Sequence, residues 1–135
     1  MSASEQVVSS GWIRRRLRSF VHAARGVFHL RTEPNARIHL VAAFFALTAG
    51  VTVRLSGVEW ALIVFAIALV LAAEALNTAL EYLANATMPN RHPLVGTAKD
   101  LGAGAVLIAA VAAAIIGVLV LGPHLFEIGL RVLQK

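Results

Sequence analysis

Three long runs of apolar residues dominate the chain, over residues 38–53, 58–84 and 101–121. They consist mainly of Leu, Ile, Val, Ala and Phe. A hydrocarbon layer of about 30 Å needs roughly 20 apolar residues in a helix, and backbone within it must satisfy its own hydrogen bonds. The first run is slightly short, but Arg37 and Arg54 at its ends can extend their charged groups to the interface. The pattern predicts an all-α membrane protein with three transmembrane helices.

A different pattern precedes these runs, over residues 12–31. Apolar residues recur there at intervals close to 3.6, and arginines occupy the other side of the helix. The apolar positions are Trp12, Ile13, Leu17, Phe20, Val21, Ala24, Val27, Phe28 and Leu30. Such a segment is typical of an amphipathic helix that lies in the membrane interface. We therefore expect an N-terminal amphipathic surface helix before the three spans.

Prolines mark the predicted breaks between helices. Pro34 disfavours helical backbone in the residue before it, so we expect a turn there and Asn35 as the N-cap of the first span. Two prolines predict a loop over residues 85–93. Gly122 and Pro123 should end the third span.

The chain is predicted to be one domain, over residues 12–122. Residues 1–11 are polar and rich in Ser, which favours a disordered leader. Residues 123–135 should form a short amphipathic tail after the third span.

Composition excludes an ordinary soluble domain. Hydrophobic residues make up 59% of the chain and charged residues only 14%, against about 45–50% and 25% in soluble proteins. The chain has no cysteine, which excludes disulfides, a thiol nucleophile and a Cys-ligated metal.

The basic residues give an orientation. Most of them precede the first apolar run: Arg14, Arg15, Arg16, Arg18, Arg25, Arg31 and Arg37. Arg91 and Lys99 lie in the expected loop after the second span. The positive-inside rule then predicts a multi-pass protein of the inner (plasma) membrane, with the N-terminus and this loop in the cytoplasm. In so apolar a chain, an anionic membrane surface or nucleotide phosphates fit this charge better than nucleic acid does.

A polar face interrupts the second run. Glu74, Asn77, Thr78 and Glu81 are spaced i, i+3, i+4 and i+7, which is one side of a helix, and Asn85 extends it. An acidic residue deep in a span costs roughly 2.5–3.5 kcal/mol even on a lenient scale. The face must therefore meet another helix, a cation or an aqueous site. One interpretation is interhelical hydrogen bonding, and the other is a functional site.

A second cluster, Lys99-Asp100 with Gly102 and Gly104, lies at the expected start of the third span. Asp100 suits a helix start through the helix dipole, and glycines allow close helix packing. These residues either cap and pack the helix or contact a nucleotide. The chain has no Walker A loop, no GxGxxG and no protein-kinase catalytic loop. The five histidines are interpreted as surface or packing residues.

Together these motifs resemble the prokaryotic diacylglycerol kinase family. The resemblance rests on Glu74-x-x-Asn77-Thr-Ala-Leu-Glu81 and Ala98-Lys99-Asp100-x-Gly102-x-x-Ala105-Val-Leu. Upstream, Glu33-x-Asn35-x-Arg37-Ile-His39 is more similar to its undecaprenol kinase branch. The resemblance implies a homotrimeric lipid kinase with active sites between subunits at the cytoplasmic interface. Its substrates would be ATP and a lipid alcohol.

Individual roles follow from the resemblance. It implies that Glu74 is the catalytic base, with Asn77 as a supporting polar contact. It implies that Glu33 and Glu81 hold Mg²⁺ bound with ATP. The residues expected to contact nucleotide or substrate are Arg15, Arg18, Asn77, Glu81, Lys99 and Asp100.

The sequence departs from the family pattern at two places. Asn85 stands where the family usually has aspartate, which removes a carboxylate near the metal. The interval from Gly26 to Glu33 is also one residue shorter than expected.

Alternatives stay open from the residues alone. The acceptor lipid is undecaprenol, which the resemblance favours, or diacylglycerol. A small oligomeric transporter or channel subunit would also use intramembrane carboxylates. A non-catalytic relative of the kinases is the third alternative, because of Asn85.

Overall fold

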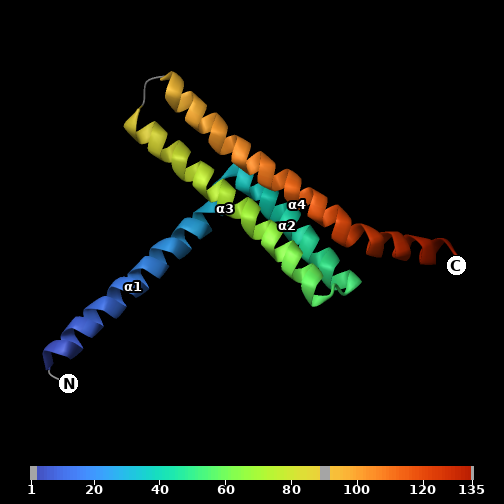
Figure 1. Cartoon of the computed structure of the whole chain (residues 1–135), viewed down its shortest axis with the longest axis horizontal. Helices are drawn as coiled ribbons and strands as arrows, with labels where there is room; N and C mark the ends of the chain where they lie inside the picture. Colours follow the sequence, from blue (N-terminus) through green and yellow to red (C-terminus); the bar gives the residue numbers. More distant parts are fainter. Residues whose placement is uncertain (1–2, 89–91, 135) are drawn as a thin grey trace.

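The computed structural model describes residues 3–88 and 92–134, with side chains from residue 12 onward. The described chain is almost entirely helical (Figure 1). Three helices are long and apolar enough to cross a membrane: α2 (Pro34–Val53), α3 (Gly57–Thr87) and α4 (Pro93–Leu133). They form a bundle in which α3 packs against both α4 and α2. The prediction of three spanning helices is confirmed.

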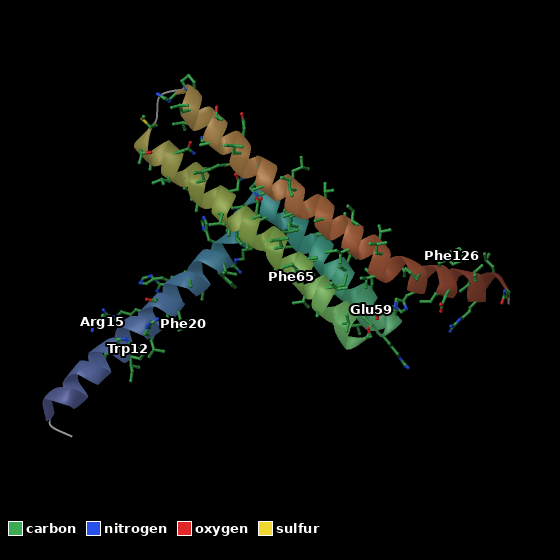
Figure 2. All side chains as sticks on the ribbon, in the orientation of Figure 1. Trp12, Arg15, Phe20, Glu59, Phe65 and Phe126 are labelled. Carbon is green, nitrogen blue, oxygen red and sulfur yellow. The ribbon has the colours of Figure 1, made fainter. Side chains whose placement is uncertain are left out.

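The first helix, α1 (Ala3–His29), projects from this bundle (Figure 1). It begins at Ala3 rather than at Trp12, so the expected disordered leader over residues 1–11 is helical from Ala3. The physical reason is that residues 3–10 contain no proline or glycine, and a single glycine at Gly11 costs a helix only about 1 kcal/mol. Trp12 and Phe20 on α1 are exposed (Figure 2). The amphipathic surface role of this helix stays a prediction.

A short 3-10 helix, η1 (Leu30–Thr32), joins α1 to α2. The predicted turn at Pro34 is confirmed, but the N-cap of α2 is Glu33 and not Asn35. Proline at the first helical position accounts for this, because its fixed φ suits that position and its missing N–H would have no partner there.

The α2–α3 connection is tight. Arg54 ends α2 in the left-handed conformation (φ 59°), and the N–H of Leu55 donates to the carbonyl of Gly50 at 3.2 Å. Ser56 then caps α3 through a capping box: its backbone N–H donates to Glu59 Oε2 at 2.7 Å, and its side chain accepts from the Glu59 N–H.

The same end of the bundle is tied to α4. Glu59, labelled in Figure 2, has its Oε1 2.8 Å from His124 Nε2. Beside this contact, Leu55, Ile63 and Val120 form a buried hydrophobic cluster. His124 is expected to be a surface or packing residue, and in the structure it is partly exposed and has a carboxylate partner.

Helix α4 extends beyond the expected span at both ends. It starts at Pro93, with His92 as N-cap, so the connection from α3 is shorter than the loop predicted over residues 85–93. It also continues through Pro123, so the expected break there and a separate tail over residues 123–135 are wrong. A proline removes one helical hydrogen bond and bends a helix without having to end it. Figure 1 shows α4 changing direction toward its C-terminal end.

Candidate active site

The polar face of α3 is turned into the bundle. Glu74 and Asn77 are the buried polar side chains of the described chain, with only 2% and 5% of their surfaces exposed. Both line a cavity of about 180 Å³ that also contacts Asn35 and His39 on α2 and Ala103 on α4. The helical period of the sequence predicted this face. Its burial among three helices agrees with the high cost of exposing a carboxylate to lipid.

Asn77 is hydrogen-bonded to the carboxylate one turn further along α3. Its Nδ2 donates to Glu81 Oε1 at 3.2 Å. Its Oδ1 is buried without a hydrogen-bond partner among the described residues. A Cβ at Gly102 would lie 2.5 Å from this oxygen, so the glycine is what lets α4 approach here. These close contacts at Gly102 therefore favour helix packing over phosphate binding.

Glu33 lies at the start of α2, and its carboxylate reaches α3. The hydroxyl of Tyr82 donates to Glu33 Oε1, and His29 Nε2 lies 3.5 Å from the same oxygen. Glu33 and Glu81 are both within electrostatic range of Glu74, and so is His39. The fold thus gathers three of the four carboxylates that the sequence singled out, the fourth being Asp100.

Lys99 and Asp100 lie in α4, inside the helix and not at its start. Lys99 is half-buried, and its Nζ donates to Asn85 Oδ1 at 2.7 Å. Asp100 is exposed, and the expected role at a helix start is wrong because α4 begins at Pro93. Because the Asn85 side chain is uncharged, this hydrogen bond does not neutralise the positive charge of Lys99.

Arg15 and Arg18 lie on α1, away from the other candidate residues. Both are exposed, and Figure 2 shows Arg15 on the part of α1 that projects from the bundle. Neither guanidinium forms an ion pair with any residue that the structure describes. A single chain therefore does not bring these arginines to the carboxylates.

Comparison with known proteins identifies the family. The model of the family described as prokaryotic diacylglycerol kinase matches residues 21–121. The chain belongs to the prokaryotic diacylglycerol kinase family. It is 42% identical over 114 residues to the undecaprenol kinase of Bacillus subtilis (strain 168), covering 84% of this chain and 93% of that protein. It is 39% identical over 112 residues to a diacylglycerol kinase of Synechocystis (strain PCC 6803), covering 82% of this chain and 64% of that protein.

Membership of the prokaryotic diacylglycerol kinase family makes this protein a membrane lipid kinase. The reaction class is phosphoryl transfer from ATP to a lipid alcohol. The sequence prediction of family and enzyme class is confirmed, including the similarity to undecaprenol kinase.

The carboxylates fit a metal bound together with nucleotide. Residues 3–88 and 92–134 contain no group of three or more His, Cys, Asp or Glu side chains able to hold a metal by themselves. Mg²⁺ at a nucleotide site needs only one or two carboxylates, because phosphate oxygens and waters complete its octahedral shell. Glu33 and Glu81 could supply two, and Glu33 Oε2 has no partner within the described chain.

Sequence reasoning missed three residues of this region. His29 and Tyr82 contact Glu33, and His39 lines the cavity with Glu74. The available signal for Tyr82 was its position next to Glu81. A tyrosine near the end of a span is, however, also typical of the membrane interface.

Proposed function

We propose that this protein transfers the γ-phosphate of ATP to the hydroxyl of undecaprenol at the cytoplasmic face of the membrane. The observation that carries the proposal is the buried pair Glu74 and Asn77, which line one cavity within a mainly apolar bundle. The higher identity and fuller coverage of the undecaprenol kinase relative favour a polyprenyl alcohol as the acceptor.

Glu74 is proposed as the general base. Phosphoryl transfer needs mainly positioning and charge stabilisation, with the attacking hydroxyl in line with the γ-phosphate. The hydroxyl oxygen forms a bond to phosphorus as the bond to the ADP oxygen breaks, and Glu74 takes the hydroxyl proton. Asn77, hydrogen-bonded to Glu81, holds the polar face together beside this carboxylate.

Glu33 and Glu81 are proposed to hold Mg²⁺ with ATP, because both carboxylates lie within electrostatic range of Glu74. A metal ion held by these two carboxylates would supply positive charge that offsets the charge of the phosphates. Lys99 supplies a positive charge to the phosphates, and Asp100 a contact to the nucleotide.

Arg15 and Arg18 would act between subunits. We propose a homotrimer, because α1 of one chain projects away from its own bundle (Figure 1) and the bundle exposes many large apolar side chains. In such an assembly the arginines of one subunit can approach phosphates bound to a neighbour. The basic N-terminal region would lie on the cytoplasmic side.

The test is a transfer assay in mild detergent with radiolabelled ATP and Mg²⁺. Undecaprenol and diacylglycerol are offered separately, and label is followed into the organic phase. We expect label in undecaprenol. Label in diacylglycerol alone would overturn the proposed acceptor. Label in neither lipid, from a well-behaved oligomer, would favour the non-catalytic or transporter alternatives.

A further inference from the structure

Three side chains from three elements meet at the base of α1. His29 ends α1, Glu33 caps α2, and Tyr82 lies near the cytoplasmic end of α3. The Tyr82 hydroxyl donates to Glu33 Oε1, and His29 Nε2 lies 3.1 Å from that hydroxyl. The rings of His29 and Tyr82 also pack together, with centroids 5.8 Å apart. We call these three residues the junction cluster.

The hydrogen bonds of the junction cluster run in one direction. A phenol has a single hydrogen to donate, and an ionised carboxylate only accepts, so the hydrogen of Tyr82 goes to Glu33. The Tyr82 oxygen is then the acceptor toward His29, which places a proton on His29 Nε2. His29 therefore donates to Tyr82, and Tyr82 donates to Glu33.

Both contacts use the same carboxylate oxygen. Tyr82 and His29 approach Glu33 Oε1, while Oε2 has no partner among the residues that the structure describes. One oxygen is thereby fixed and the other left available. Glutamate has several rotatable bonds, so without this contact the carboxylate at the start of α2 would sample many orientations.

We propose that Tyr82 is a positioning residue for Glu33, with His29 completing the arrangement, so that Glu33 Oε2 faces Mg²⁺ bound with ATP. This inference rests on the proposed role of Glu33 in nucleotide-bound metal binding. The junction cluster also joins α1 to α3. It therefore fixes the position of Glu33 relative to the C-terminal end of α1, the helix that carries Arg15 and Arg18. Pre-organisation of this kind lowers the cost of ordering a ligand on binding.

The first experiment compares Tyr82→Phe with the wild-type protein. Loss of one hydrogen bond should raise KM for Mg·ATP about 3- to 10-fold, with KM for the lipid alcohol unchanged. A second readout does not depend on turnover: Mn²⁺ with a non-hydrolysable ATP analogue is titrated and followed by electron paramagnetic resonance. Its affinity should fall by the same factor.

The matched control is Thr87→Val. Thr87 also carries a hydroxyl near the end of α3, but it donates to the carbonyl of Leu83 within the same helix. Its removal should leave both affinities unchanged. Equal losses in the two variants would overturn the proposal, because they would indicate a general effect on the end of α3.

A double-mutant cycle separates positioning from stability. In a Glu33→Gln background, Tyr82→Phe should cause no further loss of Mn²⁺·nucleotide affinity. Additive losses would contradict the proposal, and so would a lowered Tm in Tyr82→Phe with unchanged affinity. If the wild-type protein labels no lipid, the proposed function fails, but the Mn²⁺ titration still decides the role of Tyr82.

Discussion

Individual contacts explain why the two motif-bearing helices lie so close. Gly102 of α4 faces the buried Oδ1 of Asn77, and Leu80 of α3 lies beside it. No side chain fits between them, because an added Cβ would be 2.5 Å from Asn77 Oδ1 and 3.1 Å from Leu80 Cδ2. The glycine therefore holds α4 against the carboxylate-bearing face of α3.

Gly102→Ala should destabilise the protein. Overpacking of a tight interior costs about 1–3 kcal/mol, and here the neighbours are a buried amide and a packed leucine. Thermal unfolding in detergent measures the loss. Gly104→Ala is the control, since a Cβ there meets nothing within 4 Å. Equal stability of both variants would contradict the close approach at Gly102.

Lys99 should matter through its charge. Lys99→Gln is expected to raise KM for ATP about tenfold, the size of one charge-assisted hydrogen bond. Asn85→Ala removes the partner of Lys99 but keeps the ammonium, so it should have a smaller effect on KM. Initial-rate kinetics at varied ATP check this. If Asn85→Ala raises KM for ATP more than Lys99→Gln does, the hydrogen bond between Lys99 and Asn85 matters more than the charge of Lys99, which would contradict this prediction.

The carboxylates of the site were predictable from sequence, but their partners were not. Glu74, Asn77 and Glu81 follow the helical period, and the cost of a lipid-facing carboxylate requires them to point inward. Tyr82 was missed because its contact with Glu33 depends on how α2 packs against α3, and His29 because its contact depends on how α1 leaves the bundle. No periodicity within one helix encodes that angle.

Among the helices, α4 differs most from its expected form. Its start at Pro93 and its passage through Pro123 were both mispredicted, because a proline can begin or bend a helix as well as end one. The apolar cores of the spans were predicted correctly. The reason is that a bilayer imposes length and hydrophobicity on a spanning helix but leaves its ends to local capping.

His124→Ala should loosen the end of the bundle opposite the carboxylates. The variant removes the partner of Glu59 Oε1, which lies 2.8 Å from His124 Nε2, one residue after Pro123. We expect a lower Tm with unchanged KM for ATP and lipid. Arg131→Ala, which breaks only an exposed pair within α4, is the control and should leave Tm unchanged. A loss of turnover at full stability would contradict this purely structural role.

At the scale of the whole molecule, α4 is longer than the membrane is thick. Its 41 residues correspond to about 60 Å of helix at a rise of about 1.5 Å per residue, roughly twice the hydrocarbon thickness. Both ends of α4 should therefore extend beyond the hydrocarbon layer, where they can report the orientation of the protein.

The orientation can be tested by thiol labelling, because the chain has no cysteine. Thr97→Cys lies near the start of α4, and Leu133→Cys at its other end. In sealed right-side-out vesicles, a membrane-impermeant maleimide should label only Leu133→Cys, since the positive-inside rule puts Thr97 in the cytoplasm. Permeabilised vesicles serve as the control, in which both thiols should react. The reverse pattern in sealed vesicles would contradict the proposed orientation.

The central claim is that a carboxylate buried in α3 serves a lipid kinase as its base, and Glu74→Gln tests it most directly. Transfer of label from ATP to undecaprenol should fall about 10²- to 10⁴-fold, the usual contribution of a general base, while the oligomer seen by size-exclusion chromatography stays intact. Glu127→Gln makes the same change at an exposed carboxylate in α4 and should keep full turnover. Turnover of Glu74→Gln equal to that of the wild-type protein would contradict the account.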